Sequence, residues 1–98
     1  MEKLMQYVWQ HRLWRPGPMA TTDGRRLQVL DPGLLNNDAG PDFFNAKVSI
    51  DGHTWAGNVE IHVHASDWYR HGHDHDRAYD SVILHVVGHD DTPVKRPD

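Results

Sequence analysis

The sequence predicts one small α+β domain in which a mixed β-sheet is flanked by a helix. Three observations predict it: the chain has only 98 residues, one amphipathic stretch opens it, and four stretches of strand character follow between turns rich in glycine and proline. We expect the domain to span residues 1–88. Residues 89–98 are expected to form a polar tail, the start of a truncated continuation, because they carry little that could be buried.

The helix is predicted over residues 2–14, where apolar side chains recur at spacings of one, three and four. The Pro-Gly-Pro sequence at 16–18 ends it, because proline removes an amide donor and glycine is a poor helix former. A short strand follows at 27–30 and stops at the Asp-Pro-Gly turn of 31–33. Residues 34–40, rich in asparagine, aspartate and glycine, predict an irregular loop.

Two longer strands are predicted at 43–50 and 53–64, joined by a two-residue turn at Asp51-Gly52. Apolar and polar residues alternate in both, so Glu60, His62 and His64 are expected on one face of the second. Residues 66–80 are polar and aromatic and predict a short helix or loop. The last strand, predicted at 82–87, is continuously apolar around one histidine, which is typical of a strand buried on both faces.

The composition restricts the chemistry. Cysteine is absent, so disulfides, iron–sulfur clusters and cysteine-ligated zinc are excluded. The net charge is −4 with neutral histidines, and nine histidines would carry it to +5 if all were protonated. Ten basic residues against fourteen acidic ones do not form the basic patch of a tight nucleic-acid binder. The first helix is too polar for a signal peptide or a membrane span, so a cytoplasmic protein without membrane contact is expected.

Two carboxylates form the first candidate site. Asp42 precedes one strand of the hairpin and Glu60 lies on the other. Neighbouring strands are about 5 Å apart, so the two carboxylates could share one divalent cation. The competing interpretation is that Asp42 caps an aspartate-rich turn and that Glu60 belongs to the solvated face of a half-buried strand.

Pro41-Asp42 followed by Glu60-Ile61-His62 resembles the motif of the PD-(D/E)XK nuclease superfamily, a Pro-Asp followed by Glu-x-Lys. The superfamily core is also helix, three strands, helix, strand, so the resemblance implies a restriction-endonuclease-like core. It further implies a divalent-metal-dependent phosphodiesterase, a DNA nuclease or a degenerate relative of one, using Mg²⁺ or Mn²⁺. DNA is then an expected partner.

The resemblance also implies roles for individual residues. Asp42 and Glu60 would hold the metal, Ile61 would add a backbone carbonyl ligand, and His62 stands where the superfamily has its catalytic lysine. Glu2 could supply the acid that many members carry on the first helix. A neutral imidazole can act as general base but lacks the permanent positive charge of lysine. From their nearness in sequence, Arg70, His71 and His73 are candidates for phosphate contacts.

A second candidate site is the run of alternating histidines at His71, His73 and His75, joined by His62, His64 and His85. On an extended segment, alternate residues point the same way and would form a small chelating comb. Imidazole suits Zn²⁺, which makes a histidine-rich metal-binding domain without catalysis an alternative function. Gly57 with His62-Val63-His64 also resembles part of the first cupin motif, although the chain has too few strands for that barrel.

Three longer stretches carry a closer resemblance: QYVWQHRLW, the segment from TTDGRRLQVL to KVSIDG, and WAGNVEIHVHASDWYRHGHDHDRAYDSVILHVV. Together they resemble the amino-terminal part of an uncharacterised bacterial family, domain of unknown function 2851. Its members are several times longer, which implies that this chain is a fragment, a short homologue or an excised module. A noncatalytic interaction or scaffold module, packing against the remainder of a longer chain or a partner domain, is therefore the third alternative. A sheet face left open could also form a homodimer.

Overall fold

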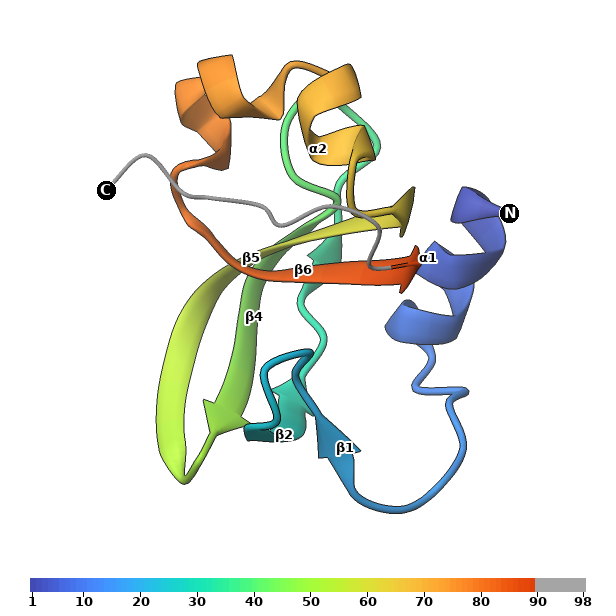
Figure 1. Cartoon of the computed structure of the whole chain (residues 1–98), viewed down its shortest axis with the longest axis vertical. Helices are drawn as coiled ribbons and strands as arrows, with labels where there is room; N and C mark the ends of the chain where they lie inside the picture. Colours follow the sequence, from blue (N-terminus) through green and yellow to red (C-terminus); the bar gives the residue numbers. More distant parts are fainter. Residues whose placement is uncertain (90–98) are drawn as a thin grey trace.

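The computed structural model describes residues 1–89 as a curled mixed sheet with a helix at its N-terminal end (Figure 1). The elements follow in the order α1 Glu2–Gln10, β1 Met19–Ala20, β2 Arg26–Asp31, β3 Leu34–Leu35, β4 Phe43–Ile50, β5 His53–His64, α2 Asp67–Arg70, the 3-10 turns η1 His73–His75 and η2 Arg77–Tyr79, and β6 Val82–His89. The tail was predicted at 89–98: its first residue, His89, is the last residue of β6, and the rest lies outside the described residues.

The sheet has the strand order β1-β2-β4-β5-β6, and β3 pairs with β4 outside that path. Strands β2, β4 and β5 are antiparallel neighbours, whereas β6 runs parallel to β5. A parallel neighbour needs a crossover connection, and α2, η1 and η2 provide it by passing over the sheet (Figure 1). The predicted α+β class with a small mixed sheet is confirmed.

The first helix is shorter than predicted, ending at Gln10 instead of residue 14. The chain reverses at Arg12, which has a left-handed φ of 56°, and the Leu13 amide donates to the Val8 carbonyl at 2.9 Å. This bond closes the helix end in the manner of a Schellman motif. The reversal brings Trp14 onto Trp9, with ring centroids 5.6 Å apart.

Two short strands, β1 and β3, were not expected from the sequence. Each has two residues, and their first residues pair as Met19 with Leu27 and Leu34 with Phe44. Gly33 makes the second pairing possible: its φ is +88°, and an added Cβ would lie 2.6 Å from the Phe44 carbonyl oxygen. No other residue type fits that approach without displacing the backbone.

The core lies on both faces of β5, the long strand between β4 and β6. On the face covered by α1, the buried residues are Trp9, Val29, Phe43, Ala46, Val59 and Ile61. On the opposite face, under the crossover, they are Trp68, Tyr79 and Val82. Strand β6 is less buried than predicted: only Val82 is buried, and 83–87 are half-buried, because β6 is the last strand of the described sheet.

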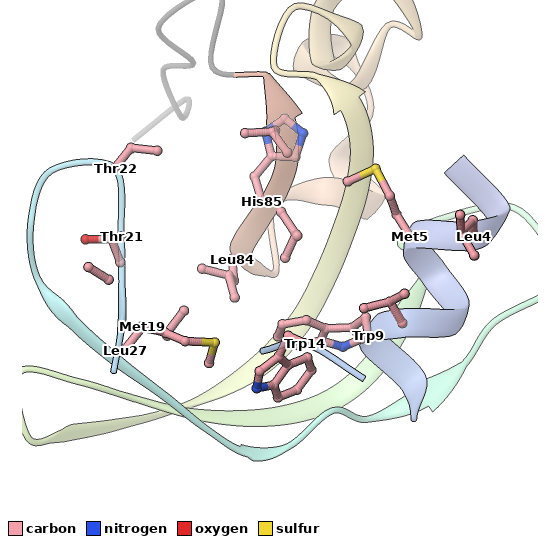
Figure 2. A pocket seen from close by; sticks show the side chains of 14 residues that line it. Leu4, Met5, Trp9, Trp14, Met19, Thr21, Thr22, Leu27, Leu84 and His85 are labelled. Atoms are coloured by element: carbon pink, nitrogen blue, oxygen red, sulfur yellow. The ribbon is translucent and has the colours of Figure 1, made fainter. Parts of the chain in front are cut away.

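An apolar cavity of about 630 Å³ opens between α1, the β1–β2 hairpin and β6 (Figure 2). Trp9, Trp14, Met5 and Met19 contribute to its wall, and His85 lies at its margin. Neither predicted metal-binding carboxylate lines it. Within residues 1–89, no helix combines the length and the apolar character needed to cross a bilayer.

Candidate metal centre

The two predicted carboxylates meet where β4 begins beside β5. The Asp42 backbone amide donates to Glu60 Oε1 at 3.2 Å, and the Ile61 amide donates to Asp42 Oδ2 at 2.8 Å. Gln6, from α1, donates through Nε2 to Asp42 Oδ1 at 2.9 Å. These bonds fix both carboxylates. Because Glu60 Oε1 accepts from the Asp42 amide, Glu60 Oε2 is left for other partners.

That second oxygen faces two histidines. Glu60 Oε2 lies 2.6 Å from His73 Nε2 and 3.2 Å from His62 Nε2, and the two Nε2 atoms are 3.2 Å apart. His71 joins the group, because ligand nitrogens of His62, His71 and His73 all lie within 4.8 Å of one another. Three donor atoms therefore converge from β5 and the crossover, with a fourth nearby.

Aromatic side chains support the histidines. The Tyr79 ring stacks on His73 with centroids 3.7 Å apart and planes at 19°. Trp68 packs edge-on against His73 and tilted against His85, at 5.5 and 5.1 Å. His85 Nε2 in turn lies 2.6 Å from His62 Nδ1. The crossover thus fixes the imidazoles as well as covering the sheet.

Burial makes the electrostatics of this group unusual. His62, Glu60 and His73 are only 0%, 3% and 8% exposed. Burial, followed by the neighbouring Glu60, raises the pKa of Asp42 to about 7, and burial raises the pKa of Glu60 to about 7. Burial also lowers the pKa of His73 and of His85 to about 4. It lowers the pKa of His62 as well.

No protein cation offsets the two carboxylates: within residues 1–89, neither Asp42 nor Glu60 forms an ion pair with lysine or arginine. A buried ionised carboxylate without a compensating positive charge is costly. Neutral imidazoles and an ionised carboxylate are, however, the forms that bind a metal ion.

The donor geometry fits a divalent cation. Ligands that bind zinc at about 2.0–2.2 Å are roughly 3.0–3.5 Å from one another in tetrahedral or octahedral arrangements. The three donor atoms of Glu60, His62 and His73 are 2.6 to 3.2 Å apart. A cation can contact all three after small outward shifts.

The sequence matches one family over residues 2–98, and that family is described as a protein of unknown function, DUF2851. The chain belongs to DUF2851. A search of the curated proteins and a search of the solved structures each found no match to this chain. The predicted membership is confirmed, and the family description assigns no activity.

The DUF2851 chain brings some of the predicted site residues together. Asp42, Glu60, His62, His71 and His73 converge. Ile61 is fully buried beside them, and its amide is the group that bonds Asp42. Glu2 is close enough for its charge to raise the pKa of Glu60. The shared face predicted for Glu60 and His62 is therefore real but buried, which contradicts the interpretation of a solvated strand face.

Other predicted residues lie outside the convergence in this DUF2851 chain. The chelating comb does not form, since 73–75 is a 3-10 turn: His73 points inward, whereas the His75 side chain is 87% exposed and pairs with Asp74. Arg70 is 73% exposed and pairs with Asp67. His64 is half-buried, and its backbone amide donates to Asp67. Gln6 was missed, because a glutamine in an amphipathic helix carries no signal of a partner 36 residues away.

Proposed function

We propose that this DUF2851 domain is a metal-dependent phosphodiesterase whose divalent transition-metal ion binds to Glu60, His62 and His73. The observation that carries the proposal is the convergence of Glu60 Oε2 with the Nε2 atoms of His62 and His73, at 2.6 to 3.2 Å, in a buried position. Nucleic acid is the proposed substrate class.

The donor set favours particular metals. Mg²⁺ prefers oxygen ligands in octahedral geometry and keeps several waters. Two imidazole nitrogens and one carboxylate oxygen instead suit Zn²⁺, Fe²⁺ or Mn²⁺. We therefore expect Zn²⁺ or Mn²⁺ to bind here more tightly than Mg²⁺.

Phosphodiester hydrolysis is favoured by the likeness to PD-(D/E)XK nucleases. Apart from the two-residue strands β1 and β3, the described chain has the order helix, three antiparallel strands, helical crossover and parallel strand, and its carboxylates stand at the motif positions. A bound divalent cation would lower the pKa of a coordinated water and offset the negative charge of the phosphate. The positive charge of the cation could also replace the charge of the motif lysine, whose position is occupied by His62 in this chain.

The protein's own residues would prepare the site for that chemistry. Asp42 holds Glu60 through its amide, and it is held in turn by Gln6 and Ile61. Asp42 would then be a supporting carboxylate or a further ligand. His71, the exposed member of the group, could contact a phosphate that approaches from solvent.

A second candidate function is metal binding without catalysis. Structural zinc sites are closed by four protein ligands, whereas catalytic sites keep one position open. His71 lies within 4.8 Å of the other imidazole nitrogens and could close the site as a fourth ligand. The two functions differ in whether the bound metal can accept substrate.

Calorimetric titration of the metal-free protein with Zn²⁺, Mn²⁺ and Mg²⁺ tests metal binding. We expect one ion per chain and a loss of binding in H73A. H75A is the matched control, because His75 comes from the same turn but is 87% exposed. Equal effects of the two substitutions, or no binding at all, would contradict the proposed site.

Cleavage assays then separate the two functions. The zinc- and manganese-loaded proteins are incubated with bis(p-nitrophenyl) phosphate and with single- and double-stranded DNA. Hydrolysis that is lost in both H73A and E60Q supports the phosphodiesterase. Stoichiometric binding without hydrolysis in the wild type and in H71A supports the structural metal site.

A further inference from the structure

We infer that His85 is a positioning residue for the metal centre: its Nε2 accepts the Nδ1 proton of His62 and so keeps His62 Nε2 free to bind the ion. This inference rests on the proposed function. It assigns a role to a residue outside the set of proposed ligands.

The contact itself is short and directional. His85 Nε2 and His62 Nδ1 are 2.6 Å apart, and the two rings stand at 89° with centroids 4.8 Å apart. A nitrogen–nitrogen distance this short requires one atom to donate and the other to accept. The two rings are therefore linked through one shared proton.

The opposite nitrogen of His62 decides the direction of that proton. His62 Nε2 lies 3.2 Å from both Glu60 Oε2 and His73 Nε2, and a metal ligand nitrogen must carry a free lone pair. If Nε2 is the metal ligand, as proposed, the proton of neutral His62 resides on Nδ1, and His85 Nε2 must be the acceptor. His85 accordingly carries its own proton on Nδ1.

The fold keeps His85 in place for this task. His85 lies on β6 directly opposite Glu60 of β5 in the parallel register, so both side chains belong to the face under the crossover. Trp68, which is 3% exposed, packs on the His85 ring at 5.1 Å. Groups that orient a metal ligand work best when they stand on rigid strands and are held by packing.

The first test measures tautomers in the metal-free wild type. Long-range ¹H–¹⁵N spectra of the imidazoles distinguish protonated from unprotonated ring nitrogens. We expect His62 to be protonated at Nδ1 and unprotonated at Nε2, with His85 unprotonated at Nε2. A His62 ring protonated at Nε2 would overturn the inference, and this readout requires neither a variant nor a metal.

The second test measures zinc affinity by competition with a chromophoric chelator. Removing the acceptor in H85L should weaken zinc binding by about 10- to 100-fold, the usual loss when an outer partner of a ligand is removed. H85Q should restore most of it, because the glutamine carbonyl can accept the same proton. H75L is the surface control and should bind like the wild type.

The outcomes separate this inference from the proposed function. If the wild type binds zinc and H85L binds it equally well, the role of His85 is refuted while the metal centre stands. If H85L and H85Q lose affinity alike, His85 acts by packing, and the inference is again refuted. If the wild type binds no metal, the proposed function fails, and the tautomer measurement still decides whether His85 accepts from His62.

Discussion

Exchanging both buried carboxylates for their amides should change how the stability of the metal-free protein depends on pH. In the double variant D42N/E60Q, each amide has nearly the shape of the protonated acid but cannot titrate. The change therefore removes the two carboxylate titrations while leaving the imidazoles of the cluster in place.

The sign follows from the pKa shifts. The pKa values of Asp42 and Glu60 rise from 3.8 and 4.5 to about 7. Between these limits the folded state binds the extra protons, so stability falls as pH rises. The pKa values of His73 and His85 fall from 6.5 to about 4. Between about pH 4 and 6.5 the unfolded state binds the extra protons of these two histidines, so their contribution to stability rises with pH.

In the wild type these opposite contributions largely cancel between about pH 4.5 and 6.5. Each proton of difference changes the free energy of unfolding by about 1.4 kcal/mol per pH unit. Removing two carboxylate titrations should therefore steepen the rise in stability by at most about 2.7 kcal/mol per pH unit. The lowered pKa of His62 acts in the same direction as those of His73 and His85.

Urea denaturation at pH 4.5, 5.0, 5.5, 6.0 and 6.5, with a chelator present, measures the effect. D74N, at a half-buried acid beside the exposed His75, is the control and should parallel the wild type. If D42N/E60Q also runs parallel to the wild type, the two carboxylates are ionised in the folded protein and the reasoning about their burial is refuted.

Three further predictions concern metal binding and packing. Zinc at 100 times its Kd should stabilise the wild type by about 2.7 kcal/mol, raising Tm by roughly 10–20 °C in scanning calorimetry; an equal rise in H73A would contradict the site. Phe43 is fully buried, so F43A should cost about 3–5 kcal/mol in urea denaturation, and a loss below about 1 kcal/mol would show that the core collapses around the gap. G33A should cost about 1–3 kcal/mol more than G24A, because Gly33 and Gly24 share a positive φ but only Gly33 has a backbone oxygen 2.6 Å from the added Cβ; equal costs would mean that β3 gives way without penalty.

Alternation and turn chemistry predicted the central hairpin well, because both are local. Asp51 and Gly52 have the positive φ values of 50° and 82° that the predicted turn requires. Alternation alone cannot explain why Phe43 and Ala46 share one core, since they are three positions apart, an odd number that would place them on opposite faces of a regular strand. Asn45, with a φ of 59°, lies within the register shift between them. No residue pattern indicated that bulge.

The candidate centre was predictable only in part for the same reason. Asp42 directly precedes β4, and Glu60 and His62 lie on the adjacent strand β5, so their closeness followed from pairing. His73 reaches them because the crossover folds back over β5, and the sequence offered three equally spaced histidines with no sign of which one turns inward. The contacts of Gln6 and His85 depend on how α1 and β6 pack against the hairpin, which is a tertiary property.

The parallel pairing of β6 with β5 also bears on the order of folding. The antiparallel strands β4 and β5 are consecutive in the chain, and only the two-residue strand β3 with its flanking turns separates β2 from β4, so their contacts close short loops. Strand β6 docks only after residues 65–81 have crossed the sheet, and closing such a longer loop costs more entropy. His73 and His85 arrive with that step. The histidine cluster is therefore absent from any early hairpin, and its assembly marks the completion of the fold.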